Sequence, residues 1–99
     1  MQKPRILDIT DSAENDLLTI WGFIALDSPR QADKFIDDLT HHLEALLDFP
    51  ELGPERPLLG KDIRAFFYGR YVVYYTITKT CIAILRVLHS ARDSAARGP

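Results

Sequence analysis

The side chains of this sequence that we consider first for acid–base and phosphate chemistry lie between residues 64 and 92. Three arginines are cations suited to a phosphate group, namely Arg64, Arg86 and Arg92. His89 can donate or accept a proton near neutral pH. Cleavage of RNA through its 2′-hydroxyl requires a base for that hydroxyl, an acid for the leaving 5′-oxygen and cations over the phosphate. These four residues supply only part of that set.

The remaining members of such a site are weakly represented. A catalytic carboxylate would have to come from Glu51 or Glu55, in a loop whose position the sequence does not fix. The same residues also have structural interpretations, with His89 as a strand-end residue that hydrogen-bonds the backbone and Arg86 as a partner of Asp93 or of acidic helices. The lysines are not clustered, since they are Lys3, Lys34, Lys61 and Lys79.

Neither the histidines nor the cysteine predicts a metal, cofactor or redox site. His41 and His42 are adjacent, so on a helix they point about 100° apart, and Glu44 offers only one further ligand at i+3 from His41. We expect a solvated helix face there. The single cysteine, Cys81, has no partner for an internal disulfide and lies in an apolar run, which predicts a small core residue.

Length and composition predict one ordinary globular domain over residues 1–99. The chain is 46% apolar and 26% charged, as in typical soluble proteins. No apolar run approaches the roughly 20 residues of a membrane span, and no basic segment precedes an apolar stretch at the N-terminus, so we expect a cytoplasmic protein. The small, polar segment 94–99 is expected to fray.

Charge is divided unequally along the chain. Residues 1–62 carry 6 Lys/Arg and 13 Asp/Glu, whereas residues 63–99 carry 6 Lys/Arg and 1 Asp. The segments therefore have net charges of −7 and +5. Two surfaces of opposite sign would result, the basic one suited to an acidic partner or a phosphate backbone. The alternative is that the two halves neutralise each other across the fold.

The stretch 70–93 predicts a hairpin of two strands around Thr78-Lys79-Thr80, because both of its halves are rich in β-branched and aromatic residues. Apolar side chains on both sides of the alternation in the first half predict a central strand. The run 81–85 is apolar at every position, which predicts burial on both faces. Shorter strands are predicted over 5–10 and 63–68.

The first helix is predicted to begin at Asp11, which with Glu14 forms a possible capping box. Some apolar residues lie off its inward face, so the helix is apolar around more of its circumference than one interface requires. The inward face is formed by Ala13, Leu17, Ile20, Trp21 and Ile24. The apolar residues off that face are Leu18, Phe23 and Leu26.

The second helix has a clearer start, because Ser28 is an N-cap residue, Pro29 suits the first helical position and Gln31 follows at the third. Only Asp27 and Ser28 separate the two helices, so an antiparallel helical hairpin is expected. Its apolar stripe is Ala32, Phe35, Ile36, Leu39, Leu43, Leu46 and Leu47.

Residues 49–62 contain three prolines and two glycines, which predicts an ordered loop without a regular element. The element order is then β-α-α-β-β-β. An α+β fold, in which the helical hairpin packs on one face of a mostly antiparallel sheet, buries both apolar helix faces.

Five short motifs occur in a fixed order along the chain. They are Ala-x-x-Asp-Leu-x-x-Ile-Trp (13–21), Ser-Pro (28–29), Phe-Pro-x-x-Gly (49–53), Arg-Tyr-Val-Val-Tyr-Tyr (70–75) and Arg-Val-Leu-His-Ser-Ala-Arg-Asp (86–93). Together with the element order, they resemble the RelE/ParE superfamily of toxin–antitoxin toxins over nearly the whole chain. The His-x-Ala-Arg-Asp ending is more similar to the ParE branch than to the RelE branch.

The resemblance implies a small toxin that forms a hetero-oligomer with a ParD-like antitoxin encoded beside it. In the ParE branch the toxin inhibits DNA gyrase and blocks replication. In the RelE branch it is a ribosome-dependent mRNA endonuclease, with a lysine-rich or Glu-and-His site. Arg64, Arg86 and His89 would be the catalytic residues here. An inactive homologue that only binds its antitoxin is a third alternative.

A gyrase inhibitor needs no catalytic group, because it acts by binding one state of its target. We expect the basic sheet rim to contact gyrase, or the DNA that gyrase holds, through Arg64, Arg70, Arg86, His89 and Arg92. An antitoxin segment would lie in an apolar groove, for which our candidates are Leu18, Trp21, Phe23 and Leu26. The alternative is that these apolar residues pack against the sheet or a loop.

Overall fold

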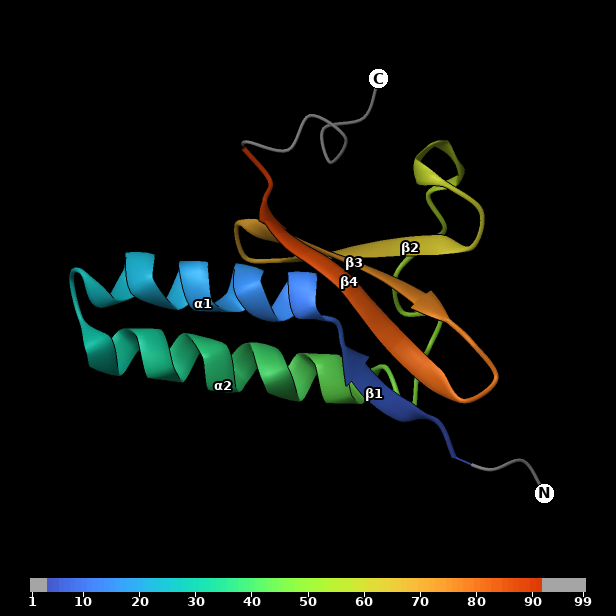
Figure 1. Cartoon of the computed structure of the whole chain (residues 1–99), viewed down its shortest axis with the longest axis horizontal. Helices are drawn as coiled ribbons and strands as arrows, with labels where there is room; N and C mark the ends of the chain where they lie inside the picture. Colours follow the sequence, from blue (N-terminus) through green and yellow to red (C-terminus); the bar gives the residue numbers. More distant parts are fainter. Residues whose placement is uncertain (1–3, 92–99) are drawn as a thin grey trace.

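The computed structural model describes residues 4–91, so Arg92 and the segment 94–99 lie outside the described residues. The element order is the predicted β-α-α-β-β-β (Figure 1). None of the helices in residues 4–91 has the length and apolar character needed to cross a membrane. The elements are β1 (Ile6–Ile9), α1 (Asp11–Ala25), α2 (Pro29–Ala45), the 3₁₀ turn η1 (Pro57–Leu59), β2 (Ile63–Tyr68), β3 (Tyr71–Ile77) and β4 (Cys81–His89).

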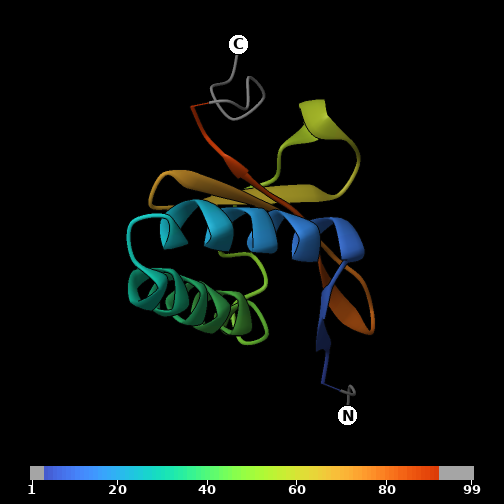
Figure 2. The ribbon, with the colours of Figure 1, turned by 60° about the vertical axis from the view of Figure 1, so that its left-hand side comes forward.

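The four strands form one sheet in the order β1-β4-β3-β2, so the predicted hairpin β3–β4 lies at its centre. β1 pairs with β4 in parallel, and the other two pairings are antiparallel. Tyr74 pairs with Arg86 and Tyr75 with Ile84, which leaves Leu85 as a bulge in β4. Figures 1 and 2 show α1 and α2 side by side on one side of this sheet. The predicted fold is therefore confirmed.

The main core lies between the sheet and the helical hairpin. A smaller cluster on the opposite face contains Ala65, Val72 and Tyr74, against which Leu59 from η1 packs. Because that face is only partly covered, Cys81 is half-buried, and the prediction that it is a core residue is wrong in part. The buried residues of the main core are Ala13, Ile20, Leu39, Leu43, Leu46, Phe66, Val73, Tyr75, Ile82, Ile84 and Val87.

The two helix starts differ in how well the sequence predicted them. Ser28 caps α2 as expected, because its Oγ accepts from the Gln31 N–H at 3.2 Å. The N-cap of α1 is Thr10 and not Asp11. Thr10 Oγ1 accepts from the Ala13 N–H at 3.3 Å and donates to the Ile84 carbonyl at 2.7 Å. One hydroxyl thus caps the helix and ties its start to β4, so Asp11 lies inside the first turn.

Three further expectations need correction. Trp21 does not pack inward but is exposed, because its Nε1 donates to Asp33 Oδ1 of α2 at 2.8 Å. Leu47 is exposed and lies outside the buried stripe of α2, whereas Leu46, the C-cap residue of the helix, is fully buried. The loop 49–62 contains a short regular element, the 3₁₀ turn that begins at Pro57.

Candidate functional site

A groove of about 460 Å³ lies between α1 and the end of the hairpin β3–β4 that is opposite its turn at Thr78-Lys79-Thr80. It exists because β1 stops at Ile9, which pairs with Ile84, while β4 continues to His89. Beyond Ile84, α1 lies beside β4, since Asp16 of α1 bonds Arg86 and Val87. Figure 1 shows α1 next to β4. The groove is lined by Asp16, Thr19, Ile20 and Phe23 of α1 and by Arg70, Tyr71, Val87, Leu88 and His89.

Asp16 links the two walls of this groove. Its Oδ2 accepts from Arg86 Nε at 2.8 Å and from the Val87 N–H at 2.9 Å, and its Oδ1 accepts from Arg86 Nη2 at 3.0 Å. The side chain of Asp16 is 14% exposed and that of Arg86 is 49% exposed. The bulge at Leu85 explains how Arg86 reaches α1, because a bulge redirects the side chains that follow it. Arg86 therefore pairs with an acidic helix, one of the two structural alternatives open to it.

The mouth of the groove carries Arg70 and His89. Arg70 is exposed in the turn between β2 and β3. The rings of Tyr71 and His89 lie 5.3 Å apart, edge to face, and His89 Nδ1 accepts from the Ala91 N–H at 3.2 Å. His89 is thus a strand-end residue bonded to the backbone.

Arg64 lies elsewhere on the sheet. Its Nη1 donates to the Gly53 carbonyl at 2.8 Å, its Nη2 contacts Glu55 Oε1 at 3.3 Å, and its side chain is only 18% exposed. In the register of β2 and β3, Arg64 lies opposite Tyr75. Tyr75 is four residues along β3 from Tyr71, which is about 13 Å along the strand. The structure thus brings Arg70, Arg86 and His89 to one end of the sheet and leaves Arg64 apart.

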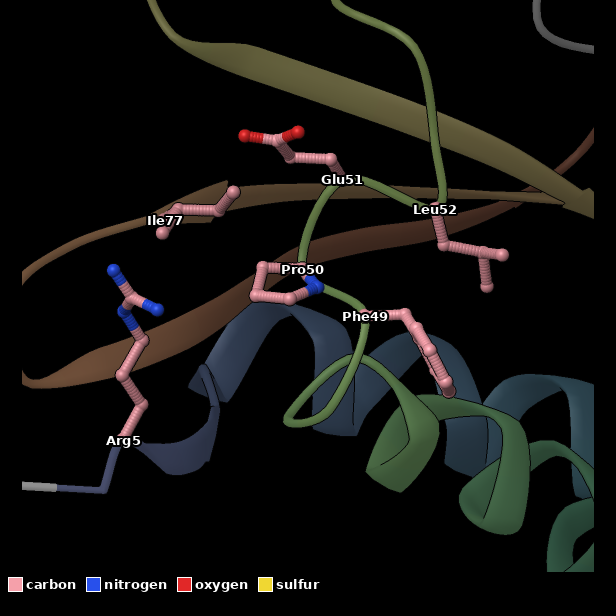
Figure 3. Close-up of a pocket in the computed structure, with 6 residues that line it drawn as sticks. All are labelled: Arg5, Phe49, Pro50, Glu51, Leu52 and Ile77. Carbon is pink, nitrogen blue, oxygen red and sulfur yellow. The ribbon is translucent and has the colours of Figure 1, made fainter.

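The loop held by Arg64 borders a second hollow, of about 480 Å³. Figure 3 shows Pro50 between Arg5 and Leu52, with the side chains of Glu51 and Phe49 pointing away from each other. Neither Glu51 nor Glu55 lines the groove that contains His89. The acid–base set considered for RNA cleavage is therefore divided between two places.

Comparison with known proteins agrees with this fold. The family model described as "ParE toxin of type II toxin-antitoxin system, parDE" matches residues 7–94. The chain belongs to the ParE toxin family. A solved structure described as "Chromosomal ParDE TA system from P. aeruginosa" superposes on this ParE-family chain with a TM-score of 0.74. The two are 22% identical, and the match covers 87% of this chain and 96% of that one. A search of curated proteins found no match.

The exposed apolar residues of α1 in this ParE-family chain do not form a single surface. Phe23 lines the groove, whereas Leu18 lies about 140° around the helix from it, since successive residues are about 100° apart. Their exposures are similar, 64% for Phe23 and 66% for Leu18. Trp21 and Leu26 are also exposed, and neither lines the groove. The candidates for antitoxin contact are thus divided between two sides of one helix.

The histidine pair of α2 has structural contacts in this ParE-family chain. His41 Nδ1 lies 2.8 Å from the Asp37 carbonyl, and the ring of His42 lies 4.7 Å from that of Tyr68. Within residues 4–91, no group of three or more His, Cys, Asp or Glu side chains is placed to hold a metal ion.

Sequence reasoning missed two residues that organise the ParE-family fold around the site. Asp16 lies on the same side of α1 as Ile20 and Phe23, at i−4 and i−7 from them. An acidic residue in line with apolar ones was the sequence signal that could have identified it.

Tyr75 is fully buried, its hydroxyl donating to the Pro50 carbonyl at 2.7 Å and accepting from the Gly53 N–H at 2.8 Å. A buried tyrosine requires such partners. Burial raises the pKa of Tyr75 above its ordinary value.

Proposed function

We propose that this chain is a toxin that arrests bacterial growth by binding DNA gyrase without breaking a covalent bond. The match to the ParE toxin family over residues 7–94 carries the proposal. A gyrase inhibitor needs orientated side chains and no catalytic group, since preferential binding to one state of the target is sufficient. Its target places its action in the cytoplasm.

The positions of the charged groups support binding over RNA cleavage. Two of the arginines needed over a phosphate are engaged, Arg64 by the Gly53 carbonyl and Glu55, and Arg86 by Asp16. His89 accepts a backbone hydrogen bond in a groove that neither candidate carboxylate lines. These contacts favour a fixed, basic contact surface over a cleavage site.

The proposed target surface is the end of the sheet that carries Arg70, Arg86 and His89. Arg92, close to Arg86 and His89 in sequence, belongs to the same proposal although it lies outside the described residues. Arg64 would contribute by holding the loop 49–62. Contact with DNA would be indirect, through the DNA that gyrase holds.

We further propose that a ParD-like antitoxin neutralises the toxin in a hetero-oligomer. Its contact surface is α1, where Leu18, Trp21, Phe23 and Leu26 are exposed. The proposal is supported by Phe23, which lines the groove between α1 and β4, since a segment that folds on binding commonly lies in such a groove.

Expression without antitoxin in a susceptible bacterium tests the function. We expect filamentation with a DNA-damage response, and loss of supercoiling when purified protein is added to gyrase. Immediate loss of protein synthesis with cleaved mRNA would replace the proposal by the RelE-type activity. Unaffected growth would indicate an inactive homologue.

A pair of charge reversals tests the target surface. Arg70→Glu changes the exposed cation at the mouth of the groove, and Lys79→Glu changes an exposed cation in the turn at the other end of β3. We expect Arg70→Glu to abolish growth arrest and Lys79→Glu to preserve it. Equal toxicity of both variants would exclude this end of the sheet as the contact.

A further inference from the structure

Within residues 4–91, no strand pairs with the outer edge of β4 beyond the point where β1 ends. Thr10, the first residue after β1, donates both its N–H, at 3.2 Å, and its hydroxyl to the Ile84 carbonyl. After the bulge, β4 continues to His89, and side chains of α1 lie beside its outer edge. An unpaired strand edge of this kind is a template for the addition of another strand.

The direction of the backbone groups can be derived from the hairpin. The Ser90 N–H donates to the Arg70 carbonyl at 2.8 Å, so Ser90 points toward β3. Successive residues of a strand alternate in direction, which places the N–H and C=O of His89 and Val87 on the opposite, outer side. The bond from the Val87 N–H to Asp16 Oδ2, at 2.9 Å, agrees with this assignment.

Asp16 therefore occupies the place of a neighbouring strand at one position. Its carboxylate takes the Val87 N–H, as a strand carbonyl would. The Val87 carbonyl and both backbone groups of His89 face the groove. A segment laid along this edge would gain main-chain hydrogen bonds there, and alternate side chains would point to either side of it.

The walls of the groove define the side chains that such a segment would carry. Ile20 and the largely exposed ring of Phe23 form an apolar wall, while Arg70 lies at the mouth. Residues 63–91 contain four Lys/Arg and no Asp or Glu, and the charge of Asp16 is balanced by Arg86. The groove is thus complementary to an extended segment with an apolar residue next to an acidic one.

We propose that the neutralising segment of the antitoxin binds as an added β-strand along Val87 to His89. Its apolar side chain packs on Phe23, and its acidic side chain pairs with Arg70. The inference rests on the proposed antitoxin partner, not on the identity of the target. Since Arg70 and His89 also belong to the proposed target surface, the added strand would neutralise the toxin by covering that surface.

Two phenylalanine variants with similar exposure test the groove. Phe23→Ala removes the apolar wall, and Phe67→Ala removes a similarly exposed ring of β2 that does not line the groove. We expect Phe23→Ala to weaken binding of the purified cognate antitoxin at least tenfold and Phe67→Ala to change it less than threefold, measured by calorimetry. The reverse order, or equal affinities, would overturn the proposal.

Amide hydrogen exchange tests the strand pairing itself. In the complex of full-length toxin and antitoxin we expect the His89 amide to exchange at least tenfold more slowly than in the free toxin. The Phe67 amide, on the outer edge of β2, serves as control and should not change. An unchanged His89 amide would overturn the added strand even if growth arrest and rescue occur.

Two other outcomes would also overturn the inference, and they differ from failure of the proposed function. Protection of His89 that grows with toxin concentration in the absence of antitoxin would mean that a second copy occupies the groove. Growth arrest that no antitoxin reverses would remove the partner but leave the gyrase proposal intact.

Discussion

The contact of Asp16 with Arg86 and Val87 predicts a specific pattern of stability losses. Asp16→Ala removes a carboxylate that accepts three hydrogen bonds, including one from the Val87 N–H of β4. A hydrogen bond to a charged group contributes about 1.5–3 kcal/mol, whereas an exposed ion pair contributes about 0.2–1 kcal/mol. Since Arg86 is half exposed, the backbone bond should dominate.

These magnitudes distinguish the variants. We expect Asp16→Ala to lower the free energy of unfolding by about 2–3 kcal/mol, and Asp16→Asn, which keeps an acceptor for Val87, by about 1 kcal/mol. Arg86→Ala should cost about 1 kcal/mol, and the coupling between Asp16 and Arg86 in a double-mutant cycle should be about 1 kcal/mol or less. For a domain of this size, Asp16→Ala should lower Tm by roughly 8–24 °C.

Urea denaturation followed by circular dichroism measures all four proteins and the double variant. Asp37→Ala, at an exposed acid of α2, is the control and should change stability by less than about 0.5 kcal/mol. A loss for Asp16→Ala no larger than that of the control would refute the assigned role of the carboxylate. So would a loss for Asp16→Asn equal to that for Asp16→Ala, because the neutral acceptor would then contribute nothing.

The same contact affects how toxicity of Arg86 variants is interpreted. Charge reversal at Arg86 places a carboxylate beside Asp16 and destabilises the fold, in addition to changing the proposed target surface. Arg70→Glu, whose side chain is exposed, does not combine these two effects. It is therefore the cleaner probe of target binding.

Three further predictions concern the packing of Tyr75, Gly53 and Gly22. Tyr75→Phe should lower the free energy of unfolding by about 1–3 kcal/mol, seen in urea denaturation, because the Pro50 carbonyl and the Gly53 N–H lose their partner. Because burial raises the pKa of Tyr75, the unfolded chain releases this proton first. The free energy of unfolding of the wild type should therefore be unaffected by this group below about pH 10 and should fall as the pH rises above it. Thermal melts at increasing pH should show a smaller fall in Tm for Tyr75→Phe, which lacks the ionisable hydroxyl. Gly53→Ala should destabilise by about 1–3 kcal/mol, since its Cβ would lie 2.6 Å from the Ala65 carbonyl oxygen, whereas a stable variant would show that the loop can shift. Gly22→Ala should raise stability in the same assay by about 0.5–1 kcal/mol, because the helix is open at Gly22 and alanine is the better helix former, and a loss there would contradict this view of α1.

Local patterns were sufficient for most of the secondary structure. Ser28 and Pro29 defined the start of α2, because capping depends on residues within one turn. The strand β2 occupies the predicted residues, and the hairpin turn at Thr78-Lys79-Thr80 separates β3 from β4 as expected. The α+β order followed from these elements.

The errors occur where a residue serves two elements at once. Thr10 caps α1 and also bonds β4, a contact 74 positions away in the chain. Trp21 matches the apolar period of α1, but its indole N–H finds an acceptor on α2 and stays at the surface. Helical periodicity alone contains no information about such acceptors.

By itself, the sequence determined the elements, their order and the types of side chain available for binding, because these depend on short-range propensities and on composition. Only the tertiary structure decided which of those side chains meet. The early end of β1 opened the groove, the bulge at Leu85 turned Arg86 toward Asp16, and the loop held by Tyr75 engages Arg64 through the Gly53 carbonyl. Each of these depends on contacts between distant parts of the chain, which no local pattern specifies.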